Sequence, residues 1–283
     1  MLSAMPADSS PNEPRGLARP LAAIGAKTNE TLAQIGAAFL LLVEVCRWII
    51  RRFTRRKVRL GRPALISQMV RIGVRSVGII SLVSGCVGLI LVLQMAPPLD
   101  EFGRKDLVAN IVGVAVLREL GPLIAAIVLT GFAGAAIAAE IGTMVVGEEI
   151  EALEAHALNP IRFLVVPRVV ATVISMTCLA VIANVVAVSA GLGMAIVFLE
   201  ISYQTYVDNL LDQIKLVDFL TGIGKATIFG LLIGLIACNN GLKVTGGAAG
   251  VGKATTDTVV QSIVAIIIAD LMFTTVFYTL KLT

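Results

Sequence analysis

Long apolar stretches dominate this chain. Residues 76–96 contain no charged side chain, and several other stretches also exceed the ~18 apolar residues that indicate a membrane-spanning helix. Of the 283 residues, 57% are hydrophobic and 15% are charged. Soluble domains, in contrast, have roughly 45–50% apolar residues. No segment between the apolar stretches is long enough to form a separate core. We therefore predict an all-α polytopic membrane protein.

Five membrane spans are predicted within residues 76–283. The first covers residues 76–96 and ends at Pro97 and Pro98. Residues 107–146 are too long for one simple crossing, at ~1.5 Å per residue against a hydrocarbon core of ~30 Å, so Gly121-Pro122 is the predicted break. The second span then covers about residues 120–144, the fourth 219–238 and the fifth 259–280. The third begins near residue 163, and its apolar pattern continues to 199 as one long bent helix or two.

Small residues recur every four positions in the first span, as Ser81 with Gly85 and Ser84 with Gly88. This spacing lets a second helix approach closely. Ordinary small residues of a membrane helix are the equally weighted alternative.

The N-terminal region divides into two parts. Residues 1–30 are rich in Pro, Ser, Ala and Gly and are predicted to be a disordered tail. Residues 31–75 are predicted to be an interfacial amphipathic region, because Glu44 and Arg47 interrupt its apolar stretch and Trp48 precedes a basic run. A membrane-surface anchor explains that run better than nucleic-acid binding does. The run contains Arg47, Arg51, Arg52, Arg55, Arg56, Lys57, Arg59 and Arg62.

The charge pattern also predicts the orientation. If the basic region lies in the cytoplasm, the linker after the second span lies there too, in agreement with Arg162 and Arg168 at its far side. Residues 242–253 are cytoplasmic only if residues 163–218 contain a single crossing. Whether residues 187–218 re-enter the membrane stays open. We therefore expect a cytoplasmic N-terminus and a C-terminus on the outer side.

An acidic amphipathic helix is predicted in the linker of residues 147–160, between the second and third spans. Apolar residues at helical spacing alternate there with glutamates, and Asn159-Pro160 ends the helix. Because such a helix has no lipid in which to bury its apolar face, we expect it to contact another protein. Its residues are Glu148, Glu149, Ile150, Glu151, Leu153, Glu154, Ala157 and Leu158.

Five charged residues lie within or near the spans. One such charge costs at least ~2.5–3.5 kcal/mol on insertion scales, so pairing is expected. Arg118 with Glu119, and Lys225 with Asp270, are the predicted pairs. They form either a polar girdle around a substrate cavity or purely structural contacts between helices. The fifth, Glu140, lies near the cytoplasmic end of the second span, where it can reach water.

The sequence offers no clear catalytic, cofactor or metal site. Residues 247–253, GAAGVGK, nearly match a phosphate-binding loop, but Ala254 replaces its hydroxyl residue and an apolar helix precedes it where a strand is required. A glycine-rich turn is predicted instead. His156 is the single histidine, which excludes a histidine cluster. The four cysteines are isolated and are predicted to be small buried hydrophobes: Cys46, Cys86, Cys178 and Cys238.

The spans, the acidic linker and the charged residues described above resemble those of the MlaE/YrbE family, the permease subunits of ABC transporters that work with MCE-domain proteins in lipid transport. The resemblance covers residues from about 75 to the end and includes Lys225 and Asp270. It is carried by RELGPLIAAIVLTG, GAAIAAEIGTM, EEIEALE, NPIRFLVVPRVVA and GLKVTGGAAGVGKATTDTVV. Two positions depart from the family pattern: Phe132 stands where the family has arginine, and His156-Ala157 where it has Met-Gly.

The resemblance implies a homodimer of five-span subunits in the bacterial inner membrane, with residues 76–283 as the permease domain. It also implies an interfacial helix, a cytoplasmic coupling helix (Glu148 to Leu158) that docks on a separate ATPase, and an MCE-domain partner outside. ATP and Mg²⁺ would bind to that ATPase. The implied cavity for acyl chains is lined by Leu91, Gln94, Met95, Leu99 and Phe102, with Arg118, Glu119, Lys225 and Asp270 as its polar girdle.

The predicted function is the permease subunit of an ATP-driven phospholipid transporter. The main alternative is a secondary transporter of an amphipathic substrate, driven by an ion gradient, which is expected to show inverted repeats that the sequence lacks. An intramembrane enzyme is disfavoured by the single histidine and the lack of a paired nucleophile and base. A non-transporting scaffold is the third alternative.

Overall fold

A computed structural model describes residues 18–54 and 62–281, and every regular element within these ranges is a helix. This confirms the prediction of an all-α protein. The residues form two compact units that divide after Leu40. Helix α1 (Ala18–Thr54) continues into the second unit, where its residues Leu41 and Val45 are buried. The basic residues 55–59, and the predicted tail up to residue 17, lie outside the described ranges.

Besides the end of α1, the described part of the second unit contains five long helical stretches. Several contain π-helical turns, here labelled η, in which the helix widens by one residue. The first stretch is α2 (Arg62–Met69), η1 (Val70–Val74) and α3 (Arg75–Glu101). The second is the 3₁₀ turn η2 (Lys105–Leu107), α4 (Val108–Ala115), η3 (Val116–Leu120), α5 (Gly121–Leu129), η4 (Thr130–Gly134) and α6 (Ala135–Val146). The third is η5 (Ile161–Val165) and α8 (Val166–Leu199), and α10 (Leu216–Leu242) and α11 (Gly247–Thr279) are the fourth and fifth.

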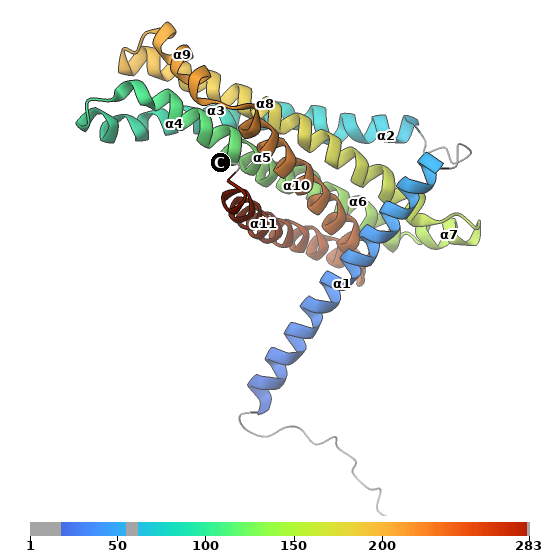
Figure 1. Cartoon of the computed structure of the whole chain (residues 1–283). Helices are drawn as coiled ribbons and strands as arrows, with labels where there is room; N and C mark the ends of the chain where they lie inside the picture. Colours follow the sequence, from blue (N-terminus) through green and yellow to red (C-terminus); the bar gives the residue numbers. More distant parts are fainter. Residues whose placement is uncertain (1–17, 55–61, 282–283) are drawn as a thin grey trace, which may run out of the picture. The chain divides into compact units, whose positions relative to one another are not determined.

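Two short helices connect the long ones. Helix α7 (Glu149–Ala155) joins the second stretch to the third, and α9 (Tyr203–Gln213) joins the third to the fourth. Figure 1 shows α7 and α9 at opposite ends of the bundle, because successive stretches alternate in direction. By length and composition all five stretches can cross a membrane, and Leu32–Arg51 of α1 also qualifies. The interfacial assignment of residues 31–75 and the sidedness of the bundle stay predictions.

Two predicted helix breaks are wrong. Pro97 and Pro98 lie inside α3, which continues to Glu101. At Gly121-Pro122 the helix also continues, because η3 immediately precedes the proline and the N–H of Gly121 donates to the C=O of Val116, five residues earlier. The wider turn accommodates a proline ring that would otherwise clash with the preceding turn of an α-helix.

Two further segments are more helical than their glycines indicate. Residues 166–199 form the single helix α8, and α9 packs against α4 after it. The prediction of a glycine-rich turn at residues 247–253 is wrong, because these residues form the first turns of α11. The turn lies just before them, at residues 243–246, where Gly246 has a φ of 85°. The element before them is α10, in place of the strand that a phosphate-binding loop follows.

Helix α8 packs against α3, α5 and α10 at the centre of the bundle. Close approach of backbones is possible because small residues stand at the contacts. A Cβ atom added at Gly88 of α3 would lie 2.1 Å from the carbonyl oxygen of Ala187 in α8. Ser84, one turn earlier, is 1% exposed. This confirms the close-packing interpretation of the Ser84/Gly88 spacing.

Candidate functional site

Helix α10 supplies the base of the candidate site. Asp218 and Lys225 lie two turns apart on one face of the helix, and both side chains are 1% exposed. Asp218 also caps the start of the helix, because its Oδ2 accepts a hydrogen bond from the N–H of Lys215 at 2.9 Å. A side-chain acceptor at this place satisfies a backbone donor that has no partner within the helix.

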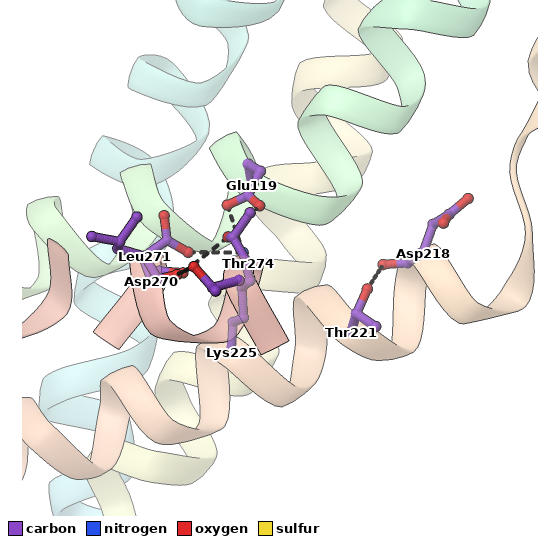
Figure 2. Close-up of polar contacts among 8 residues, drawn as sticks. Glu119, Asp218, Thr221, Lys225, Asp270, Leu271 and Thr274 are labelled. Atoms are coloured by element: carbon purple, nitrogen blue, oxygen red, sulfur yellow. Dashed lines mark hydrogen bonds and ion pairs between the residues drawn. The ribbon is translucent and has the colours of Figure 1, made fainter. Parts of the chain in front are cut away.

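Lys225 is the centre of a cluster of polar side chains from three helical elements. Its Nζ lies 2.6 Å from Oε2 of Glu119 in η3, 2.9 Å from Oδ1 of Asp270 and 2.8 Å from Oγ1 of Thr274, both in α11. Figure 2 shows these side chains pointing toward one another. The ammonium group donates hydrogen bonds to the oxygens of Glu119 and Thr274, whereas its contact with Oδ1 of Asp270 is an ion pair without a hydrogen bond. The hydroxyl of Thr274 in turn donates to Oε1 of Glu119 at 2.8 Å.

Arg118 forms the second half of the site. Its Nε donates to Oδ1 of Asp218 at 2.6 Å. The predicted pairing of Arg118 with Glu119 is therefore wrong, whereas that of Lys225 with Asp270 is confirmed and extended to Glu119. Asp218 and Thr274 were missed by sequence reasoning. The position of Asp218, seven residues before Lys225 at a helix start, is the signal that could have identified it.

The cluster is buried at its base and open at its rim. The side chains of Arg118, Glu119 and Asp270 are 24%, 34% and 16% exposed, whereas Lys225 and Asp218 are almost fully enclosed. Two cations meet three carboxylates, so the group carries one excess negative charge when all five are ionised. Charges in a membrane bundle are costly unless they pair or reach water, and the charges of this cluster pair while its rim stays partly exposed.

The residues expected to contact acyl chains form a separate group at the end of α3. Leu91, Met95 and Leu99 recur every four residues and pack against the buried cluster that contains Val92, Val108 and Tyr206. Gln94 and Phe102 are exposed, Phe102 by 79%. The structure thus divides the nine expected substrate-binding residues into this apolar group and the charged cluster, and a common cavity stays a prediction.

Helix α7 presents charge outward and apolar side chains inward. Glu149, Glu151 and Glu154 are exposed, whereas Ile150 packs against the main core and Leu153 is partly buried. Glu148 precedes the helix in a left-handed conformation with a φ of 57°, and Ala157, with a φ of 56°, ends the segment. His156 and Leu158 are exposed beyond the helix, so the helical part is shorter than the predicted docking segment.

A second charged group, Arg71, Glu140 and Arg168, includes residues from both helices that flank α7. Glu140 is 28% exposed, as expected of a side chain that can reach water, but it also forms ion pairs that were not predicted: its Oε2 lies 2.9 Å from Nη1 of Arg71 and its Oε1 lies 3.2 Å from Nη2 of Arg168. The Glu140–Arg168 pair joins the helix before α7 to the helix after it. Phe132, at the position where the family pattern has arginine, is 44% exposed on the same side of the bundle and contributes no charge.

The four cysteines are all free, and Cys238 alone among them is buried. Cys46, Cys86 and Cys178 are exposed, on helices that qualify as membrane spans by length and composition. The prediction of buried cysteines is thus correct for Cys238 and wrong for the other three within the isolated chain.

Comparison with known proteins identifies relatives over most of the chain. Residues 65–276 match the family described as Permease MlaE. A Rickettsia prowazekii protein named "Probable ABC transporter permease protein" is 36% identical over 76% of this chain and 83% of its own length. A Synechocystis protein with the same description is 33% identical over 83% of this chain and 87% of its own.

A plant relative is also similar. The chloroplastic protein TRIGALACTOSYLDIACYLGLYCEROL 1 of Arabidopsis thaliana is 32% identical over 75% of this chain, which covers 61% of the plant protein. Both the Lys225 cluster and α7 lie within the segment that matches the family.

Proposed function

This chain belongs to the MlaE family of ABC transporter permeases, and we propose from that premise that it is the membrane subunit of an ATP-driven phospholipid transporter. In this proposal a second copy of the chain completes a lipid-binding cavity, and a separate cytoplasmic ATPase supplies the energy. An MCE-domain protein on the outer side exchanges lipid with the cavity. The bacterial inner membrane, with the α7 end of the bundle in the cytoplasm, is the proposed location.

The single observation that carries the coupling part of this proposal is the form of α7. Ile150 is anchored on the core of the bundle while Glu149, Glu151 and Glu154 remain exposed. A short acidic surface at the end of a bundle suits a basic groove on a partner, since complementary charge steers association and fixes orientation. The Glu140–Arg168 ion pair, 3.2 Å long, connects the helices on either side of α7. A displacement of α7 would therefore be transmitted directly into α6 and α8.

The lipid part of the proposal rests on the combination of apolar and charged surfaces. The outer face of α11 exposes large apolar side chains, among them Ile267, Leu271 and Met272, next to the partly open Lys225 cluster. Such a surface suits acyl chains or a second copy, and the charges suit a phosphate or amine headgroup. That the plant relative is named after a galactolipid also supports a lipid substrate.

Charge reversal on α7 tests the coupling. The change is Glu149→Lys, Glu151→Lys and Glu154→Lys in a tagged full-length chain, purified with its associated proteins from its own cells. We expect the ATPase to be lost from the purified complex, because three attractive contacts become repulsive. The matched control reverses three exposed acids at the other end of the bundle, Glu101, Asp208 and Asp212, and should retain the ATPase. Equal retention by both variants would refute docking through α7.

Reconstitution tests the substrate and the energy source. Transfer of labelled phospholipid by the complex in proteoliposomes should require ATP, and Asp270→Asn should slow it while the complex still assembles. Transfer that needs an ion gradient but no ATP would support the secondary transporter instead. Intact ATP hydrolysis without lipid transfer would support the scaffold.

A further inference from the structure

A small cavity lies on the α7 side of the bundle, apart from the Lys225 cluster. Its volume is about 150 Å³, and it is lined by Gln68, Arg71 and Arg75 on one side and by Phe132 and Glu140 on the other. The first three residues are spaced by three and four positions, which places them on one face of the helix that runs through η1. The cavity therefore faces two guanidinium groups and one amide.

Positive charge exceeds negative charge at this cavity. Glu140 is the carboxylate that contacts both Arg71, at 2.9 Å, and Arg168, at 3.2 Å. Arg168 is only 5% exposed, and its Nη1 has no hydrogen-bond partner among the described residues. Within the described part of the chain no carboxylate pairs with Arg75. Glu140 is thus paired with Arg71 and Arg168, and Arg75, which also lines the cavity, has no carboxylate partner within the described residues.

The cavity combines this charge with an apolar wall. Ile72 and Phe132 line it beside the arginines, and Phe132 is 44% exposed. Glu140 lies six residues before α6 ends at Val146, so it is ~9 Å from the helix end at ~1.5 Å per residue. This depth fits the boundary between the headgroups and the hydrocarbon of the leaflet on the α7 side.

We propose that this cavity binds a phosphate anion through Arg71 and Arg75, with the amide of Gln68 as a further donor. Arginine side chains bind phosphate oxygens through paired, charge-assisted N–H donors. An incoming phosphate compensates the excess charge and takes over the donors of Arg71 that now face Glu140. An anionic phospholipid satisfies the site most fully, because its headgroup contacts the arginines while its glycerol and first acyl carbons contact Phe132. A soluble phosphate is the other source of the same chemistry.

Native mass spectrometry of the full-length, delipidated chain in detergent tests this site. The probes are phosphatidylglycerol, phosphatidylcholine and inorganic phosphate. We expect phosphatidylglycerol to bind more tightly than phosphatidylcholine, and Arg71→Gln with Arg75→Gln to weaken its binding about tenfold or more through the loss of charge-assisted hydrogen bonds. The matched control, Arg104→Gln with Lys105→Gln, removes two exposed cations at the other end of the bundle and should bind normally.

A second variant keeps the charge and fills the space. Ala136→Leu adds bulk to the cavity lining without altering either arginine, and it should also weaken binding. Loss of inorganic phosphate binding in the arginine variant would identify a general phosphate site, whereas loss confined to the lipid would identify a membrane-lipid site. Unchanged binding of both probes in the arginine variant, or an equal loss in the Arg104/Lys105 control, would overturn the proposal. Because transport is not measured, a failure here leaves the proposed transport function standing.

Discussion

Arg118 and Asp218 are 100 residues apart in the sequence, yet the Nε of Arg118 lies 2.6 Å from the Oδ1 of Asp218. The same carboxylate caps the N-terminus of α10 by accepting a hydrogen bond from the N–H of Lys215 at 2.9 Å. One buried side chain therefore joins the second and fourth helical stretches and also sets where the fourth one starts. Helix length and site geometry are linked at this residue.

Asp218→Asn separates these two roles. Asparagine keeps an oxygen for the N–H of Lys215 but removes the charge that faces Arg118. We expect the free energy of unfolding to fall by about 3 kcal/mol, at the low end for a broken buried pair because Arg118 is partly exposed. Thermal unfolding in detergent measures this change. Asp212→Asn, at an exposed position on α9, is the control, and equal stability of the two variants would show that the pair adds little.

The Lys225 cluster should show strong coupling between its charges. Lys225→Met removes the buried ammonium and leaves Glu119 and Asp270 facing each other without a cation. Adding Glu119→Gln and Asp270→Asn should restore part of the lost stability, with an interaction energy of ~0.5–3 kcal/mol. The measurement is a mutant cycle of unfolding in detergent. Additive losses would mean that the three side chains do not act together.

The close contact between α3 and α8 depends on the glycine at position 88, which has no side chain. Gly88→Ala should destabilise the bundle, because the new Cβ would lie 2.1 Å from the carbonyl oxygen of Ala187 and the helices must separate. The expected loss is about 1–3 kcal/mol, measured as a shift of the unfolding midpoint. Gly78→Ala, on the same helix with open space around it, should be neutral or slightly stabilising. Similar shifts in both variants would indicate a general helix effect.

The phenol of Tyr206 should lose its proton at a higher pH than an ordinary tyrosine does. It is 0% exposed in α9, and burial raises the pKa of its phenol from 10.0 to about 12. Because the folded-state pKa lies above the unfolded one, the stabilising contribution of the neutral phenol is complete below pH 10.0 and is lost as the pH rises to about 12. Ultraviolet absorbance of the phenolate should show a component near pH 12 that Tyr206→Phe removes. The control variant Tyr203→Phe should leave the component near pH 12 in place. If the component persists in Tyr206→Phe, its assignment to Tyr206 is contradicted.

The spans were predictable because apolar length is a property of the sequence alone. The same holds for α7, whose glutamates and apolar residues alternate at helical spacing. Helix ends at proline and glycine were not predictable to the same degree. Pro97, Pro98 and Pro122 would end an α-helix in isolation, but the helix continues through all three, and at Pro122 the preceding π-helical turn η3 allows this.

The charged residues of the site were recognisable, whereas their partners were only partly so. Charge in an apolar span singled out Arg118, Glu119, Lys225 and Asp270. Asp218 was hidden because it adjoins a polar connecting segment, and only the fold shows that it turns inward to 1% exposure. The partners of Glu140 were missed for the related reason that both arginines lie on other helices.

The π-helical turn of η3 makes chain length itself a requirement for the site. Arg118 and Glu119 are adjacent in this turn, yet they reach Asp218 and Lys225, which lie two turns apart on α10. Losing one residue between Val116 and Leu120 would close this wider turn to a regular α-helical one. Arg118 and Glu119 would then no longer both point toward α10, and buried Asp218 or Lys225 would lose its partner. Selection should accordingly tolerate substitutions of Val116 or Leu117 far better than any deletion here.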